Sequence, residues 1–439
     1  MRGRVVIVQR RLPGERCMLD ELHELAEAAG YEVVCRVEQV REPDPKYNLG
    51  RGKVKELAEL VSKLGVSKVV FFNELKPVQA YNLSKELGVD VIDRFELILE
   101  IFAARAGSRE AKLQIELARL KRELSFIKER IRLAKRGELP GFHGGGTYAF
   151  DAHYRHAVRR IAKIERELER LRRSKDVRWK RRVERGLYSV ALTGYTGAGK
   201  TTLFKALTGY EGYIDGKPFA TLSTKAKRTR LLGLPVLVSD TIGFIDALPP
   251  LLLDAFYTTL GELCYADLIL LLVDISEEEG EVRRKVEASL DVLAELGIPE
   301  SRIVCAANKV DKVDSDALDS KLELVRGYGF KVVPISALKG YGLDELVIEV
   351  VRSLPDLKVV EIEGNGDLAS LLKSLAEHCY VRLSGHERPK LLVAGRGAWL
   401  ERVIRVFNGA DLKVRRLDVE EWIRSESRRL KARSQGWQG

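Results

Sequence analysis

A glycine-rich loop that ends in lysine and threonine has the clearest chemistry in this sequence. Residues 194–201 read GYTGAGKT and match the pattern GxxxxGK(S/T) at every position. The glycines allow backbone N–H groups to turn toward a phosphate. The Lys200 ammonium would neutralise the β- and γ-phosphates, and the Thr201 hydroxyl would bind Mg²⁺. The predicted nucleotide contacts in this loop are Gly194, Tyr195, Thr196, Gly197, Ala198, Gly199, Lys200, Thr201 and Thr202.

A second phosphate motif, DTIG, occupies residues 240–243. The Asp240 carboxylate would hold Mg²⁺ through a water molecule, and the Gly243 N–H can meet the γ-phosphate. A lone DxxG is a weak signal, but here it follows the strand after the glycine loop, which makes it a strong one. It adds Asp240, Thr241, Ile242 and Gly243 to the predicted site.

Two further motifs would recognise the base. Residues 308–311 read NKVD, and the Asp311 carboxylate can accept hydrogen bonds from N1–H and the 2-amino group of guanine. Adenine has neither donor, and an unpaired buried carboxylate is costly, so Asp311 would select guanine. Asn308 would meet the other edge of the base, and the Lys309 stem would pack over its ring. The predicted base contacts are Asn308, Lys309, Val310, Asp311, Ser336, Ala337 and Leu338.

A threonine between the first two motifs is needed to complete the Mg²⁺ shell when the γ-phosphate is present. Thr221 is our candidate, with Thr224 and Thr229 as nearby competitors. We predict Thr201 and Thr221 as metal ligands, and Lys200 and Thr221 as catalytic residues. The loop adds Phe219, Ala220, Thr221, Leu222 and Ser223 to the predicted nucleotide contacts.

Each of these motifs follows a short apolar run that is typical of a strand, and helical runs alternate with these apolar runs. This alternation predicts an α/β domain, which we assign to residues 187–354. The strands that we expect directly before the motifs are Ser189–Thr193, Val236–Ser239, Ile303–Ala307 and Val332–Ile335.

The two ends of the chain show the same alternation. Residues 1–107 are predicted to form a small α/β domain with a parallel sheet. Residues 355–439 form a last α/β segment, bounded by Pro355, that ends in a basic tail from Arg424 to Arg433.

Between Ser108 and Gly186 the sequence is helical and strongly basic. This stretch holds 24 basic and 11 acidic residues, against 51 and 53 in the remainder of the chain. Apolar residues recur at spacings of three and four from Leu113 to Ala134 and again from Tyr154 to Leu171, and PGFHGGG lies between them. We predict an antiparallel helical hairpin whose basic faces meet polyphosphate. Two separate helices, and a merely solvated basic face, are the alternatives.

Composition places the chain among soluble globular proteins. The five cysteines form no CxxC pair, and the N-terminal apolar run is too short for a signal peptide. The longest apolar stretch, Leu268–Val273, is far shorter than a bilayer span. We expect a cytoplasmic monomer without a transmembrane segment, which could also lie at the periphery of a membrane.

Together these motifs resemble the HflX family of P-loop GTPases. The resemblance rests on GYTGAGKTTLFKALTG, PFATL, DTIGFI, NKVD and ISAL, and on NLGRGK and PGFHGGG upstream, and covers roughly residues 1–350. It implies binding to the large ribosomal subunit, with rRNA contacts through residues 108–186 and the N-terminal domain, in ribosome splitting, rescue or stress response. The family usually has Asn where this chain has Gly197, and that Asn resembles the residue by which related GTPases bind an activating K⁺, so K⁺ stimulation is not expected. The family also usually has Asp where this chain has Ser223, a departure in the loop after Thr221.

The residue after DTIG predicts how hydrolysis is controlled. Ras-like enzymes place a Gln there to orient the attacking water, whereas this chain has Phe244, which cannot hydrogen-bond water. We therefore expect slow intrinsic conversion of GTP to GDP, accelerated by a partner. Arg228 and Arg230 are close enough in sequence to be considered as arginine fingers, but they are equally plausible as surface charges.

Three other functions fit parts of the sequence. The chain could be a GTP-dependent switch in signalling or at membranes, with the hairpin on a protein or on anionic lipid. It could be an NTPase that remodels free RNA. It could also be a coiled-coil scaffold with a vestigial nucleotide fold, in which case turnover would be unmeasurable.

Overall fold

A computed structural model describes residues 2–135, 146–211, 225–241, 243–244, 263–364, 368–384, 390–407 and 412–435. By their contacts, the described residues up to Leu171 form one compact unit and those from Arg172 onward form a second. We describe each unit by itself. The predicted division into four segments stays a prediction.

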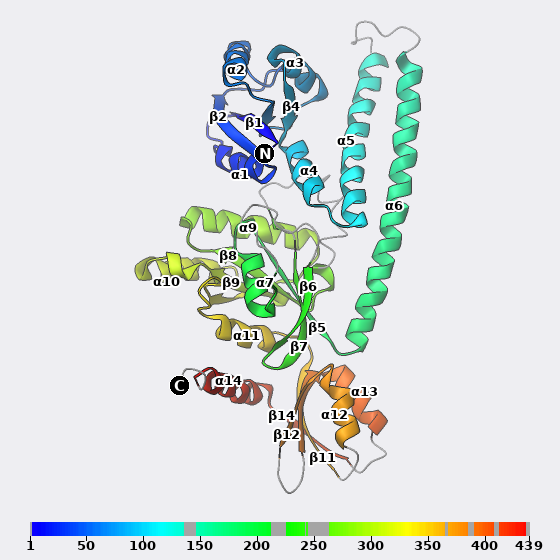
Figure 1. Ribbon diagram of the computed structural model, residues 1–439, viewed down its shortest axis with the longest axis vertical. Helices are drawn as coiled ribbons and strands as arrows, with labels where there is room; N and C mark the ends of the chain where they lie inside the picture. The colour runs from blue at the N-terminus through cyan, green and yellow to red at the C-terminus, as the bar shows by residue number, and fades with distance from the viewer. Residues whose placement is uncertain are drawn as a thin grey trace. The chain divides into compact units, whose positions relative to one another are not determined.

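The first unit begins with a four-stranded parallel sheet of order β2-β1-β3-β4, which confirms the expected α/β fold (Figure 1). Helices α2 and α3 cover one face, over a core that includes Leu49, Leu57 and Phe71. The elements are β1 (Gly3–Arg11), α1 (Leu19–Ala28), β2 (Tyr31–Val40), α2 (Arg51–Leu64), β3 (Lys68–Phe71), α3 (Pro77–Leu87), β4 (Asp90–Asp93) and α4 (Arg94–Arg105).

Two long helices follow, α5 (Arg109–Lys135) and α6 (Gly146–Glu184), and they run side by side in Figure 1. Their apolar seams meet as predicted, because Leu113 and Leu117 of α5 share a buried cluster with Ile161, Ile164 and Leu168 of α6. The packing favours the hairpin over two separate helices. Most of the PGFHGGG stretch, residues 140–145, lies outside the described residues.

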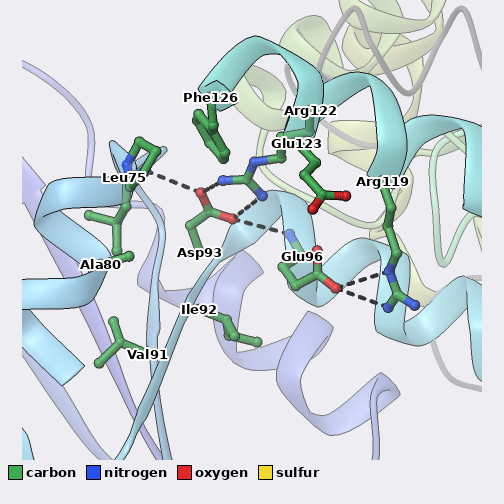
Figure 2. A pocket seen from close by; sticks show the side chains of 11 residues that line it. Leu75, Ala80, Val91, Ile92, Asp93, Glu96, Arg119, Arg122, Glu123 and Phe126 are labelled. Atoms are coloured by element: carbon green, nitrogen blue, oxygen red, sulfur yellow. Dashed lines mark hydrogen bonds and ion pairs between the residues drawn. The ribbon is translucent and has the colours of Figure 1, made fainter. Parts of the chain in front are cut away.

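Helix α5 is tied to strand β4 and helix α4 by one ion pair each (Figure 2). The Arg122 guanidinium forms a two-pronged pair with the Asp93 carboxylate, and both side chains are nearly buried. Arg119 pairs with Glu96 at 2.9 Å, in a more exposed position. A cavity of about 350 Å³ lies beside these pairs, with an apolar wall that includes Leu75.

The second unit contains a six-stranded sheet of order β10-β9-β8-β5-β7-β6, parallel except for the β6–β7 hairpin. The edge strand β6 was missed by the sequence analysis. The elements are β5 (Tyr188–Gly194), α7 (Lys200–Thr208), β6 (Lys225–Leu231), β7 (Leu234–Asp240), β8 (Leu268–Asp274), α9 (Glu279–Glu295), η1 (Glu300–Arg302), β9 (Ile303–Asn308), η2 (Val310–Lys312), α10 (Ser315–Arg326), β10 (Lys331–Pro334) and α11 (Leu343–Arg352).

The last segment is an antiparallel sheet of order β12-β13-β11-β14 in a βαββαβ chain, which is a ferredoxin-like arrangement. Helices α12 and α13 share one core with this sheet, whose other face joins the core of the six-stranded sheet. The elements are β11 (Leu357–Gly364), α12 (Leu368–Ala376), β12 (Tyr380–Ser384), β13 (Lys390–Arg396), α13 (Gly397–Phe407), β14 (Leu412–Leu417) and α14 (Val419–Gln435).

The end of the chain differs from the sequence-based description. The basic tail belongs to helix α14, whose Trp422 and Ile423 side chains are buried in the shared core. None of the helices in the described ranges is long and apolar enough to span a bilayer.

The tie between α5 and the sheet generates a stability prediction. Arg122→Met leaves the nearly buried Asp93 carboxylate without its guanidinium partner, which should lower the local unfolding free energy by about 3 kcal/mol. Arg119→Met breaks a more exposed pair and should cost under about 1 kcal/mol. Amide hydrogen exchange of α4 and α5 in the two variants measures both effects. Equal protection in the two variants would contradict the larger contribution that we assign to the pair of Arg122 with Asp93.

Candidate functional site

The glycine loop connects β5 to α7 at the carboxyl end of a central strand, where open α/β sheets bind ligands. Two of its glycines are required by close approaches. Gly194 has a φ of +136°, and a Cβ there would lie 2.3 Å from the Leu272 carbonyl oxygen. Gly199 has a φ of +98°, and a Cβ there would lie 2.3 Å from Asn308 Nδ2. A larger residue at either position would push the loop away from its neighbours.

The Lys200 ammonium lies inside this loop. Its side chain is buried, and Nζ donates to the carbonyl oxygens of Gly194 at 2.9 Å and Tyr195 at 2.7 Å. Burial lowers the pKa of Lys200 to about 8, and the nearby Asp240 carboxylate opposes that shift. The ammonium is therefore held by weak acceptors in a place where phosphate oxygens would stabilise its charge more strongly.

The predicted Mg²⁺ ligands from the first two motifs lie together. The Thr201 hydroxyl donates to Asp240 Oδ2 at 2.9 Å, and Asp240 is fully buried at the end of β7. Hydroxyl and carboxylate oxygens are the donors that Mg²⁺ prefers. The donor chemistry therefore fits the ion, with Thr201 and Asp240 beside the lysine that would meet the same phosphates.

Phe244, after the DxxG motif, is fixed to the glycine loop by its backbone. Its N–H donates to the Gly194 carbonyl at 3.0 Å, and its carbonyl accepts from the Thr196 N–H at 2.8 Å. The side chain is 4% exposed. Gly243 lies against the lysine, because a Cβ there would be 2.7 Å from Lys200 Nζ. The DxxG turn and the phosphate loop are thus one packed structure.

Asn308 joins the phosphate loop to the base loops. Its Nδ2 donates to the Ala198 carbonyl at 2.7 Å, and its Oδ1 accepts from the Ala337 N–H at 2.9 Å. From the sequence, Asn308 is expected to meet the edge of the base. In the structure both ends of its buried amide bond to neighbouring loops, which gives it a positioning role.

The Asp311 carboxylate lies beside Ser336 and is exposed in the free protein, so a bound base would be what buries it. A hydrogen bond from Ser336 keeps the pKa of the Asp311 carboxyl below its usual value. The carboxylate therefore remains ionised and able to accept from a base. Lys309 forms an ion pair with Asp274 at the end of β8, which fixes its stem at the base loop.

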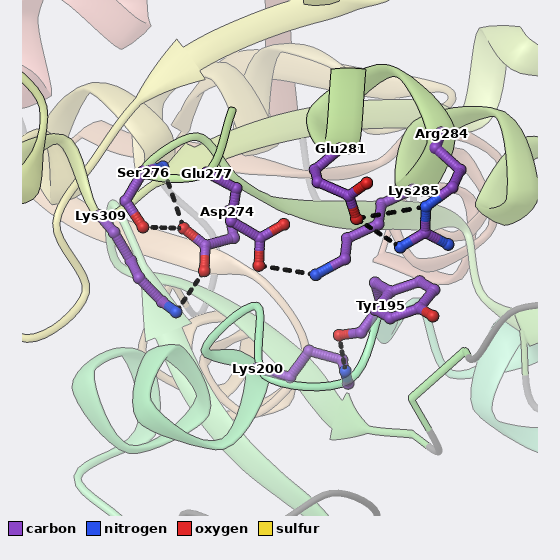
Figure 3. Close-up of polar contacts among 9 residues, drawn as sticks. All are labelled: Tyr195, Lys200, Asp274, Ser276, Glu277, Glu281, Arg284, Lys285 and Lys309. Atoms are coloured by element: carbon purple, nitrogen blue, oxygen red, sulfur yellow. Dashed lines mark hydrogen bonds and ion pairs between the residues drawn. The ribbon is translucent and has the colours of Figure 1, made fainter. Parts of the chain in front are cut away.

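A second layer of charged residues was missed by the sequence analysis (Figure 3). The buried Tyr195 ring lies under two cations of α9, Lys285 Nζ at 4.7 Å and Arg284 Cζ at 5.4 Å from its centroid. Lys285 also pairs with Glu277 at 2.6 Å. These residues belong to no short motif, so only the tertiary fold shows that α9 supports the phosphate loop.

Comparison with known proteins decides the family. Family models described as the N-terminal and middle regions of GTP-binding GTPases match residues 16–103 and 105–182, and one described as a 50S ribosome-binding GTPase matches residues 189–309. The GTPase HflX of Thermofilum pendens is 58% identical over 381 residues, which covers 86% of this chain and 90% of the relative. The chain belongs to the HflX family of GTPases. It binds GTP and hydrolyses it.

Other HflX proteins and one solved structure agree with this assignment. The GTPase HflX of Thermococcus kodakarensis is 45% identical, over 80% of this chain and 82% of the relative. The crystal structure of SsGBP in complex with GDP is 31% identical and matches with a TM-score of 0.50, over 79% of this chain and 97% of that chain. The resemblance to HflX proteins and the expected P-loop GTPase fold are confirmed.

Several predicted site residues of this HflX-family chain have other partners or cannot be placed. The Thr241 hydroxyl donates to the Leu192 carbonyl at 2.7 Å. Thr229 lies in β6 and donates to the Leu207 carbonyl, which removes it as a Mg²⁺ ligand. Leu338 is 74% exposed. Those outside the described residues are Phe219, Ala220, Thr221, Leu222, Ser223, Thr224 and Ile242.

The buried Lys200 makes nucleotide affinity depend on pH. In the free protein its pKa is about 8, so the ammonium is charged at pH 7 and loses its proton as pH rises through that value. Bound phosphates stabilise the charged form and raise the pKa, so binding above pH 8 takes up a proton and affinity falls as pH rises.

Calorimetry of GDP binding in two buffers of different ionisation enthalpy measures this proton. Near pH 8.5 we expect an uptake of about half to one proton per nucleotide, and near pH 7 much less. The absence of any difference in uptake between the two pH values would contradict the role given to Lys200.

Proposed function

We propose that this GTPase hydrolyses GTP slowly by itself and associates with the large ribosomal subunit, which completes its active site. The observation that carries the proposal is the environment of Phe244. The residue that would orient the attacking water is apolar, 4% exposed, and fixed through its backbone to Gly194 and Thr196. A partner is therefore needed to supply the missing group.

An internal arginine finger finds little support in β6. Arg230 donates to the carbonyl oxygens of Gly233 at 2.9 Å and Ala376 at 3.1 Å, so its guanidinium has a structural role. Burial lowers the pKa of the His378 imidazole, and the charge of Arg228, on the same strand as Arg230, lowers it further. Neither arginine is directed to the phosphate loop by a described contact.

Basic helices support an RNA-containing partner. Residues 108–186 have 24 basic and 11 acidic residues, and some of these charges are used within the hairpin, as in the pair of Arg160 with Glu116 at 2.6 Å. Helical cations that meet phosphates give affinity without reading sequence. The family model for residues 189–309 is itself described as a 50S ribosome-binding GTPase.

The chain's own residues would then act mainly by positioning. Lys200 would bind the β- and γ-phosphates, and Thr201, Asp240 and Thr221 would hold Mg²⁺, with Asp240 acting through water. When bound, Mg²⁺ supplies charge neutralisation between the phosphates. Asp311 would bind the guanine edge. The glycine loop and the DxxG motif would hold the γ-phosphate in line with a water that the partner orients.

Co-sedimentation and turnover with purified large subunits test the proposal. We expect the protein to travel with the subunits in the presence of a non-hydrolysable GTP analogue and to be released with GDP, and subunits to raise the GTP turnover rate by about tenfold or more. Lys200→Ala should abolish the nucleotide dependence.

Two outcomes would overturn the proposal. One is a turnover rate that is the same with and without subunits. The other is co-sedimentation with anionic vesicles or binding to naked RNA that exceeds binding to intact subunits, which would favour the membrane or RNA-remodelling alternatives.

A further inference from the structure

A small cavity lies in the second unit between the end of α6 and the six-stranded sheet. Its volume is about 120 Å³, well below the roughly 300 Å³ or more of pockets that hold drug-sized ligands. A single phosphate group is therefore a better match in size than a whole nucleotide. The cavity is lined by Lys175, Arg178, Trp179, Arg182, Ser189, Ala226, Leu237, Ser239, Tyr265 and Ala266.

The wall of this cavity carries positive charge only. Lys175, Arg178 and Arg182 recur at spacings of three and four, so they lie on one face of α6. No carboxylate is among the lining residues. Elsewhere in the hairpin, cations such as Lys121 are paired with glutamates. Within the described part of the chain, neither Arg178 nor Arg182 forms an ion pair.

Two acidic side chains hydrogen-bond to lining residues of the cavity. Asp176 accepts a hydrogen bond from the Tyr265 hydroxyl. Asp267 pairs with Arg396 at 2.6 Å and accepts from the Ser189 N–H at 2.8 Å and hydroxyl at 3.1 Å. Arg396 balances Asp267, and neither carboxylate is paired with Arg178 or Arg182 in the described residues, so these two cations have no carboxylate partner.

Direct contacts hold the aromatic side of the cavity wall together. The Trp179 Nε1–H donates to the Tyr265 carbonyl at 2.5 Å, and the two rings lie 5.6 Å apart. This contact holds α6 against the residues that precede β8, and Arg178 and Arg182 line the cavity with exposed side chains. Arg178 Nε donates to the Ser174 carbonyl of its own helix, which leaves its terminal nitrogens for a ligand. A planar guanidinium fork suits phosphate oxygens in particular.

We propose that this cavity is a phosphate-binding site, occupied by a phosphate group of an RNA backbone or of a smaller phosphate compound. The site extends the proposed contact with the large ribosomal subunit. It does not depend on that contact, since its ligand chemistry can be tested without ribosomes. The cavity is also next to the nucleotide site along the chain, because its lining residue Ser239 directly precedes Asp240 of the DxxG motif.

Calorimetry on the GDP-saturated full chain tests the site, since GDP occupies the phosphate loop. The probes are inorganic pyrophosphate and a short RNA duplex. The variant Arg178→Gln/Arg182→Gln removes two lining cations. The matched control, Lys180→Gln/Arg181→Gln, removes two exposed cations of the same helix that do not line the cavity. Both variants should keep the basal rate of GTP hydrolysis.

We expect the lining variant to weaken binding of at least one probe by about tenfold or more, and the control by no more than about twofold. Loss for RNA alone assigns the site to a polynucleotide backbone, and loss for both probes shows that free phosphates also fill it. Equal losses in the two variants would mean diffuse attraction to a basic helix and would overturn the proposal, as would no binding of either probe by the unaltered protein.

Discussion

The buried amide of Asn308 is the interaction on which the nucleotide site depends. It bonds to the phosphate loop at Ala198 and to the base loop at Ala337, so loops far apart in the sequence are held at fixed separation. Phosphate and base contacts must fit one rigid ligand at the same time, and a shift of about 1 Å would weaken both. A side chain at Gly199 would displace this amide.

A second layer of polar and aromatic contacts supports the residues of the nucleotide site. Tyr195 connects the phosphate loop to Lys285 of α9, and Asp274 connects the base loop to β8 through Lys309 (Figure 3). Phe244 ties the DxxG turn to the same phosphate loop. An apolar residue is sufficient for that packing, so Phe244 supports the phosphate loop without a polar side chain that could orient water.

The motif residues could be named from the sequence because phosphate and guanine chemistry restrict which side chains can serve, and their nucleotide contacts stay predictions. It predicted the parallel sheets because alternating apolar strands and amphipathic helices leave a clear pattern. It missed the edge strand Lys225–Leu231, whose charged residues hide the alternation, and the short strand Tyr380–Ser384. It described α14 as a basic tail because arginines outnumber the two buried apolar residues, Trp422 and Ile423, that anchor the described part of the helix. Such tertiary contacts leave no local signal.

The central claim is that loops held at fixed separation build a guanine-specific site. Nucleotide competition with the variant Asp311→Asn tests this claim. Asparagine replaces one acceptor with a donor, so GTP should bind about 100-fold more weakly, while xanthosine triphosphate, which has a carbonyl in place of the 2-amino group, should bind more tightly. Asp316→Asn, an exposed change in α10, should alter neither. Unchanged preference for GTP over ATP and xanthosine triphosphate in Asp311→Asn would contradict the account.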